Sequence, residues 1–306
     1  MKGLELAKLL YETEGKQALK DAFPELYERM AVGLVGEGSE CFGFDDEQSA
    51  DHDYGPSFCI WLNEVDYRHY GEEVQEVYDN LKIPDGYSKR NETNLAGKRV
   101  GVFSLQDWYR KYTGYPYGPR DWKEWIRVPE SNLATATNGE VYTDPMGMFS
   151  DVRKYLLGFY PEDVRLKKMA RRCAEMAREG QYNYPRSVIR GEMVAAELAL
   201  AKFTEAAMSM IYLLNKKYAP YYKWTHRGLK DMEILPRAYS LFDHLIKDND
   251  PKIRAGYIER ICILIEAELK REDLSQAGDT FIQVHAIELM KRIENPQIRA
   301  MHILMG

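Results

Sequence analysis

The 306-residue chain has few cysteines and lacks any apolar run long enough to cross a membrane. Its cysteines are scattered, with no close pair and no histidine at zinc-ligand spacing: Cys41, Cys59, Cys173 and Cys262. This pattern favours reduced structural thiols over disulfides or a zinc site. The N-terminus also lacks a basic region followed by an apolar stretch, so we expect a cytoplasmic protein without a membrane partner.

The chain also lacks an excess of positive charge, since its formal net charge is −6. Such a balance argues against a protein that coats nucleic acid through the phosphate backbone. With 45% hydrophobic residues, the chain can bury one large core or two modest ones. We expect two domains, residues 1–147 and 148–306, and an α+β fold in which a mixed sheet with helices precedes an all-helical bundle.

A glycine-rich turn follows the first predicted strand. Residues 31–35 are apolar and predict a short buried strand, and Gly36, Gly38 and Ser39 come directly after it. Glycine allows the main chain to bend sharply because it has no Cβ. The sequence therefore predicts a turn at Gly38 and Ser39 that binds phosphate groups.

Two aspartates at alternate positions follow this turn. If the segment is extended, Asp51 and Asp53 leave the same face of a strand and converge on one point. Paired carboxylates beside a phosphate site suit magnesium, or manganese in its place, bound together with a nucleoside triphosphate. The structural alternative is a solvated loop in which either aspartate caps a helix or a turn.

The Gly-Ser turn and the Asp-x-Asp pair together resemble the signature of the DNA polymerase beta-like nucleotidyltransferase superfamily, which also contains the antibiotic nucleotidyltransferases. The longer run is similar to an uncharacterised bacterial family of predicted nucleotidyltransferases with a helical C-terminal half. The residues that carry this resemblance are 38–46, Ser49, 51–55, 182–183, Arg186, Arg190 and 220–224, within residues 25–235.

The resemblance implies a third metal-binding carboxylate on the strand predicted at residues 99–103. The residue aligned there is Gly101, and the nearest acid, Asp107, falls on the following predicted helix. A missing third carboxylate commonly weakens the metal that activates the attacking hydroxyl. Either Asp107 or another acid substitutes, or the protein binds nucleotide without turnover.

The second half of the chain is predicted to be helical throughout. Residues 186–217 have apolar positions at helical spacing and predict the central helix of a bundle. Arg186, Arg190 and Glu197 then fall close together in projection near its start. The arginines suit nucleotide phosphates, but an ion pair that joins two helices is an equal alternative. In the antibiotic nucleotidyltransferases that the chain resembles, the helical half supplies the base that deprotonates the acceptor, which here implies Glu197 or Glu192.

A second cluster interrupts the helical pattern at residues 220–224, which contain two tyrosines, a lysine and a tryptophan. In a nucleotide pocket, Lys223 would contact the triphosphate and a ring would stack on the base. The alternative is a helix junction, or a surface where the lysine stem covers apolar area.

These features lead to three functional hypotheses. The first is an enzyme that transfers a nucleoside monophosphate from a triphosphate to a hydroxyl of a small molecule or protein, releasing pyrophosphate. The second is a nucleotide sensor without turnover, and the third is an interaction protein with a decayed catalytic domain. The sequence does not choose among ATP, GTP, CTP and UTP, and a homodimer is compatible with its helical half.

Overall fold

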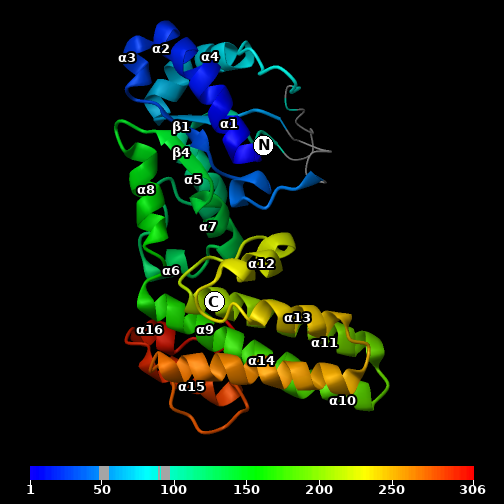
Figure 1. The fold of residues 1–306 in the computed structure, drawn as a ribbon. Coiled ribbons are helices and arrows are strands. Elements are labelled where there is room, and N and C mark those ends of the chain that lie inside the picture. Colours follow the sequence, from blue (N-terminus) through cyan, green and yellow to red (C-terminus); the bar gives the residue numbers. More distant parts are fainter. Residues whose placement is uncertain (48–54, 89, 91–96) are drawn as a thin grey trace. The chain divides into compact units, whose positions relative to one another are not determined.

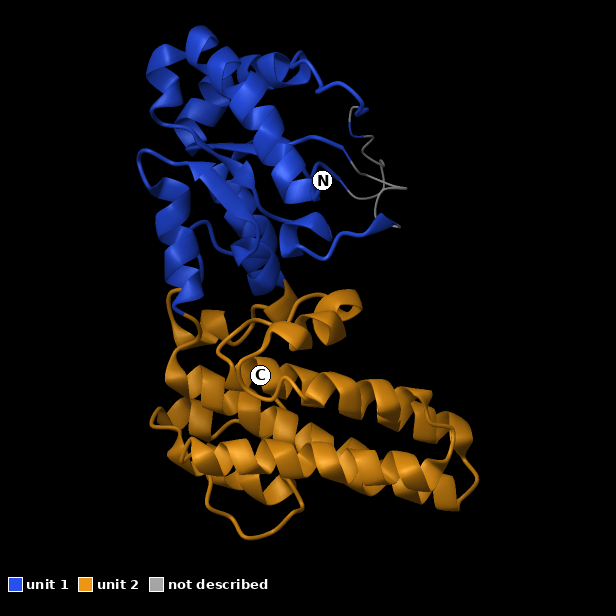
Figure 2. Cartoon of the chain, viewed as in Figure 1, with its two compact units in different colours: residues 1–119, 132–158 blue, residues 120–131, 159–306 orange. Residues whose placement is uncertain are grey.

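The computed structural model describes residues 1–47, 55–88, 90 and 97–306. The chain divides into two compact units (Figure 2): unit 1 comprises residues 1–119 and 132–158, and unit 2 comprises residues 120–131 and 159–306. The sequence-based boundary falls after residue 147, whereas the chain passes finally into unit 2 after residue 158.

Unit 1 contains a four-stranded sheet and the helices around it (Figure 1). Its strands are β1 (Ala31–Leu34), β2 (Cys59–Leu62), β3 (Gly101–Ser104) and β4 (Glu140–Thr143). Its helical segments are α1 (Gly3–Leu10), the π-helix η1 (Tyr11–Gly15), α2 (Lys16–Ala22), α3 (Pro24–Tyr27), the 3₁₀-helix η2 (Glu40–Phe42), α4 (Glu64–Asp79), α5 (Leu105–Thr113) and α8 (Met148–Leu157). Helix α7 (Glu130–Thr137) contains residues of both units.

The sheet is mixed, with the strand order β3-β2-β1-β4. Strand β1 pairs antiparallel with β2, where Val32 lies opposite Ile60, and β2 pairs parallel with β3. Strand β4 pairs antiparallel with β1 at the edge, and the register shifts between Val32 and Gly33. These strands and the helices of unit 2 confirm the predicted α+β fold class.

Strand β2 is buried on both faces because helical segments cover the sheet on each side. Ile60 and Leu62 face a core shared with α1, η1, α2 and α4, which includes Leu10, Tyr11, Leu19 and Val74. Trp61 points to the other face, where its ring stacks on Phe149 of α8 at a centroid distance of 4.0 Å. The alternation of side chains along β2 therefore anchors this central strand in apolar packing on both faces of the sheet.

Unit 2 is helical. Its segments are α6 (Trp122–Trp125), α9 (Glu162–Met176), the π-helix η4 (Ala177–Asn183), α10 (Tyr184–Ile189), α11 (Met193–Leu214), α12 (Tyr222–Gly228), the 3₁₀-helix η5 (Leu229–Asp231), α13 (Ala238–Lys247), α14 (Pro251–Arg271), α15 (Gln283–Arg292) and α16 (Pro296–Arg299). Helix α9 packs against α11 and α15, and α13 packs against α14. The apolar stripe of α11 is buried as predicted at Ala196, Leu200, Phe203, Ala207, Met210 and Leu214. Met193, which the same spacing assigned to the stripe, is instead 43% exposed.

The prediction of one helix over residues 186–217 is wrong at its N-terminal end. Helix α10 stops at Ile189, Gly191 adopts a φ of +75°, and α11 begins at Met193. A positive φ ends a right-handed helix, and glycine adopts it without a Cβ clash. Arg186 and Arg190 therefore belong to a different helical segment from Glu197, and their predicted projection onto one helix face does not apply.

The four cysteines are free and buried, as their spacing indicated. Burial raises the pKa of the thiols, as it does for Cys173 and Cys262, so they remain protonated in this environment. Among the described residues, no helix combines the length and apolar character that crossing a membrane requires.

Candidate functional site

The turn after β1 is built around two glycines. Gly36 has a φ of +134° and Gly38 a φ of +130°, values that side-chain-bearing residues rarely adopt. Ser39 then precedes the single turn of η2. The chain therefore reverses within a few residues at the end of a buried strand, as the sequence predicted for a phosphate-binding turn.

The main-chain amides of this turn are available to a ligand. Among the hydrogen bonds of the described residues, the N–H groups of residues 37–40 donate none. Consecutive amides without a protein acceptor form the kind of concave donor array that binds anions in other proteins. The turn thus offers donors to an anionic group.

Glu37, inside the turn, is surrounded by cations and a phenol. Its carboxylate lies 2.9 Å from Lys111 Nζ and 3.5 Å from Arg99 Nε, and it accepts a hydrogen bond of 3.3 Å from the hydroxyl of Tyr112. Burial, followed by the charge of Glu37, raises the pKa of Tyr112 far above its ordinary range, so the hydroxyl remains a donor. Two positive charges are therefore held at the edge of the turn.

A third cation approaches the turn through Glu40. Arg90 Nη1 donates to Glu40 Oε1 at 3.0 Å and to Ser57 Oγ at 3.3 Å, and the side chains of this ion pair are only 5% and 11% exposed. A Cβ at Gly38 would lie 2.4 Å from Glu40 Oε2. The carboxylate of Glu40 therefore packs directly on Gly38, which is a second reason for glycine at that position.

Both ends of the turn are fixed by one distant segment. The side-chain oxygen of Asn138 accepts from the Gly36 amide at 2.9 Å, and its Nδ2 donates to the Gly36 carbonyl at 2.8 Å. The amide of Gly139 donates to the carbonyl of Cys41 at 2.8 Å. The residues just before β4 thus hold the turn in one conformation, so that its amides need no rearrangement to meet a ligand.

The metal-binding pair predicted from the sequence, Asp51 and Asp53, lies outside the described residues. Within the described part of the chain, no group of three or more histidine, cysteine or acidic residues could hold a metal. Gly101, aligned with the third carboxylate, begins β3 with a φ of +97°. Asp107 lies in the first turn of α5, where it is exposed and pairs with Arg110.

The candidate residues of α10 and α11 have separate surroundings. Arg186 places its guanidinium 4.7 Å from the ring centre of Tyr182. Glu197 pairs with Arg254 of α14, which is the helix-to-helix ion pair that the sequence left open as an alternative. Arg190 follows α10 and Glu192 precedes α11, and both side chains are exposed. The described contacts do not join the two arginines to Glu197.

Lys223 lies in the first turn of α12 and is exposed. Before it, the rings of Tyr221 and Tyr222 meet at a centroid distance of 4.4 Å, and both tyrosines are largely exposed. This arrangement agrees with the helix junction that was one of the two alternatives for the cluster. It also leaves the lysine accessible from solvent.

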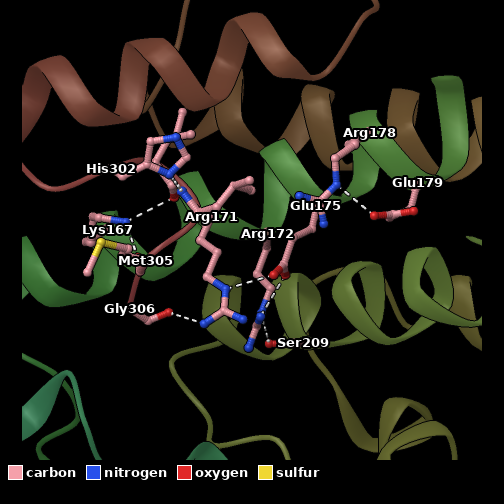
Figure 3. Close-up of polar contacts among 12 residues, drawn as sticks. Lys167, Arg171, Arg172, Glu175, Arg178, Glu179, Ser209, His302, Met305 and Gly306 are labelled. Carbon is pink, nitrogen blue, oxygen red and sulfur yellow. Dashed lines mark hydrogen bonds and ion pairs between the residues drawn. The ribbon is translucent and has the colours of Figure 1, made fainter. Parts of the chain in front are cut away.

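A polar network in unit 2 was not foreseen from the sequence (Figure 3). Arg172 of α9 donates to Glu175 and to Ser209 of α11, at 2.9 and 2.8 Å. It also donates to Glu130 at the start of α7, at 3.0 Å. Glu130 also accepts from Ser209 at 2.8 Å. Each group has a partner and most are buried, so we interpret the network as structural: it joins three helical segments.

The residues that complete the turn of unit 1 were also missed. Arg90, Arg99, Lys111 and Asn138 reach it from segments far along the chain, so no local spacing could indicate them. Glu37 and Glu40 lie on either side of Gly38 and Ser39 in the motif itself, and two acids at such a turn were a signal that compensating cations must be near.

Comparisons with known proteins find two partial similarities. The model of a family described as a domain of unknown function (DUF4037) matches residues 125–225, which is less than half of the chain. A crystal structure of a nucleotidyltransferase-like protein from Exiguobacterium sibiricum 255-15 aligns over 92% of this chain and 81% of that chain, with 13% identity and a TM-score of 0.39. No curated protein matches. Similarity at this level adds nothing to the argument from the residues.

Proposed function

We propose that the protein binds a nucleoside triphosphate at the turn after β1 and transfers its nucleoside monophosphate to a hydroxyl group, with release of pyrophosphate. The observation that carries this proposal is the turn itself. Its amides at residues 37–40 have no acceptor among the described residues, and Arg90, Arg99 and Lys111 surround it. A triphosphate needs this combination of main-chain donors and positive charge.

In this proposal the cations exchange partners when the nucleotide binds. Glu37 and Glu40 neutralise Lys111, Arg99 and Arg90 in the free protein. Phosphate oxygens compete for the same donors, while Gly38 and Ser39 provide amides to the β and γ phosphates. Positioning and charge neutralisation supply most of the acceleration in phosphoryl transfer.

The metal would be held by Asp51 and Asp53, on the basis of the sequence alone. Magnesium, when bound, supplies positive charge to the phosphate oxygens. Arg186, Arg190 and Lys223 are the proposed phosphate contacts of unit 2. Of the two glutamates proposed as the base, Glu192 has no ion-pair partner among the described residues, whereas Glu197 is held by Arg254, so we favour Glu192.

A second candidate function is a nucleotide sensor that releases the triphosphate unchanged. Two residues favour it: Gly101 is the residue that the sequence resemblance aligns with the third carboxylate, and Asp107 is paired with Arg110 at the surface. Binding would then depend on the turn and on Asp51 and Asp53, while the step that activates the acceptor would be missing.

Calorimetry tests the nucleotide site. Each triphosphate is titrated into the protein with magnesium, and we expect binding that the double variant Asp51→Asn, Asp53→Asn abolishes. Lys111→Gln should weaken binding by about tenfold, the loss expected when one charged phosphate contact is removed. Lys16→Gln is the matched control, since it removes an exposed lysine of α2 that pairs only with Glu12. Equal affinity in wild type and Lys111→Gln would refute the assignment of the turn.

Transfer of label separates the enzyme from the sensor. The protein is incubated with triphosphates labelled at the α-phosphate, magnesium and a cell extract. The enzyme hypothesis expects label on a small molecule or protein, and expects none with Glu192→Gln. Binding by calorimetry without transfer to any acceptor would favour the sensor.

A further inference from the structure

A cavity of unit 1 lies between its edge strand β4 and helix α8. Its volume is about 420 Å³. The nucleotide proposal makes no use of it. Its walls are formed by the main chain around β4 and by one side of α8: Gly139, Glu140, Val141, Ser150, Arg153, Lys154 and Leu157.

Arg153 brings a positive charge into this cavity without a carboxylate partner among the described residues. Its Nη2 donates to the main-chain carbonyls of Asn138 and Gly139, both at 3.2 Å. Its Nε is buried and donates to no acceptor in the described part of the chain. Burial lowers the pKa of this guanidinium, which indicates that the charge is poorly solvated. Because Nε has almost no accessible surface, a ligand in the cavity would meet another part of the half-buried guanidinium, whose charge has no carboxylate partner among the described residues.

The other polar side chains of the cavity add to the positive charge. Ser150 and Lys154 lie one turn apart on the same side of α8 as Arg153. The described contacts assign no partner to the hydroxyl of Ser150 or to Nζ of Lys154. Glu140 also lines the cavity, but its carboxylate is 2.5 Å from Lys8 of α1 and is neutralised there. The cavity therefore holds two cations and a hydroxyl, and its carboxylate, Glu140, is already paired with Lys8.

We propose that this cavity is a binding site for the phosphate group of a small phosphomonoester. A guanidinium, an ammonium and a hydroxyl are the groups that recognise phosphate oxygens in proteins. The cavity falls in the size range of small-molecule sites, and Val141 and Leu157 supply apolar area beside the cations. The ligand is thus an organic phosphate, whose organic part rests on these two side chains.

Arg153 also has a structural role, which makes it a poor residue to replace in a test of the site. Because it holds the carbonyls of Asn138 and Gly139, its replacement also loosens the segment that fixes the turn at Gly36. Lys154→Gln and Ser150→Ala are better probes, since neither side chain has a hydrogen bond or an ion pair to that segment among the described residues. Lys16→Gln removes an exposed lysine elsewhere in unit 1 and serves as the charge-matched control.

The experiment is a titration followed by amide NMR and calorimetry in a buffer without phosphate. The probes are inorganic phosphate and glycerol 3-phosphate, with glycerol and acetate as comparison arms. We expect both phosphates to shift the amide signals of residues 139–141 and 150–157, and glycerol 3-phosphate to bind more tightly. Lys154→Gln and Ser150→Ala should each raise the dissociation constant about threefold or more, and the double variant about tenfold.

The site fails if the shifts are confined to residues 36–40, because phosphate would then occupy the turn after β1. It also fails if Lys154→Gln binds glycerol 3-phosphate as wild type does, or if acetate binds as well as phosphate. The variant Asp51→Asn, Asp53→Asn should keep full phosphomonoester affinity. A failure of the nucleotide proposal therefore leaves this result unchanged.

Discussion

The side-chain amide of Asn138 forms two hydrogen bonds with the main chain of Gly36, 102 positions earlier in the sequence. One bond is accepted from the Gly36 amide and the other is donated to the Gly36 carbonyl. Gly139, the next residue, donates to Cys41. The conformation of the glycine-rich turn is therefore imposed by the segment before β4, in addition to the glycines themselves.

Asn138→Ala should lower the free energy of unfolding by about 1–3 kcal/mol, because it leaves two partly buried main-chain groups of Gly36 without partners. It should also weaken binding of the magnesium triphosphate several-fold, since the amides of the turn lose their fixed direction. Denaturant unfolding and calorimetry measure the two effects. Asn132→Ala, which removes one hydrogen bond to the carbonyl of Tyr112, is the control and should leave nucleotide affinity unchanged. If Asn138→Ala bound the magnesium triphosphate with wild-type affinity, nucleotide binding would not depend on the hydrogen bonds between Asn138 and Gly36.

Lys168→Met should stabilise the protein at pH 7, by on the order of 2 kcal/mol. Lys168 is 5% exposed in unit 2, and burial, together with the charges of Arg172 and Arg171, lowers its pKa to about 8. A lysine whose pKa is lowered by folding destabilises the folded state while it is charged. This cost in free energy of unfolding is complete below pH 8, and it is relieved as the pH rises toward 10.5, the ordinary pKa of lysine. The difference in free energy of unfolding between Lys168→Met and the wild type should therefore decrease between pH 8 and pH 10.5.

Denaturant unfolding of both proteins at pH 7 and pH 10 measures this difference. Lys202→Met, a change at an exposed lysine of α11, should have little effect at either pH. A loss of stability in Lys168→Met at pH 7 would contradict the expectation, since it would show that the charged lysine contributes more through Glu130 and the ring of Tyr160 than its burial costs.

Glu175→Gln should destabilise unit 2 at pH 7 by about 1–2 kcal/mol. Burial alone raises the pKa of Glu175, but the charges and hydrogen bonds of Arg172 and Arg171 outweigh it, so the pKa lies below its ordinary value. When folding lowers the pKa of an acid, its ionised form stabilises the folded state. This stabilisation is complete when the pH is above the pKa of the acid in the unfolded state, and it is lost as the pH falls through the pKa of the acid in the folded state.

The destabilisation should therefore be full at pH 6–7 and should decrease as the pH falls below the ordinary value of 4.5, as measured by denaturant unfolding along this range. Glu288→Gln is the control, because Glu288 pairs with Lys291 at the surface and should contribute less than about 0.5 kcal/mol. If Glu175→Gln lowered the free energy of unfolding equally at every pH, the lost stability would be due to packing and not to the charge of Glu175.

Two glycine substitutions in unit 2 should change stability in opposite directions. Gly191→Ala should cost about 1–2 kcal/mol, because the residue has a φ of +75° although no atom lies within 4 Å of a Cβ there. Gly256→Ala, within α14 and also in open space, should stabilise by about 0.5–1 kcal/mol. Thermal unfolding compares the two. If both substitutions changed the stability in the same direction, the positive φ of Gly191 would not be the cause of the break between α10 and α11.

The sequence predicted the first strand because residues 31–35 are consecutive hydrophobic residues and a glycine, and β1 is buried at every position. The glycines after it predicted a turn, and Gly36 and Gly38 both have a positive φ. Such features are local, so a single segment contains the information that determines them.

Features that depend on distant contacts could not be predicted in this way. The break at Gly191 was missed because the apolar spacing of α11 dominated the pattern before it. The partner of Glu197 could not be identified, since Arg254 belongs to another helix. Arg153 gave no signal at all, because an arginine in an amphipathic helix is normally solvated. The roles of Asp51 and Asp53 remain predictions.

The hydrogen bonds between Asn138 and Gly36 also determine when the glycine-rich turn can take its final conformation during synthesis. Gly36 to Ser39 leave the ribosome roughly a hundred residues before the asparagine that closes their turn. A nascent chain that ends before β4 carries the whole recognisable motif but not the hydrogen bonds that shape it, and contacts between distant residues form late in folding. Nucleotide-binding capacity should therefore arise in one late step, when the edge strand joins the sheet.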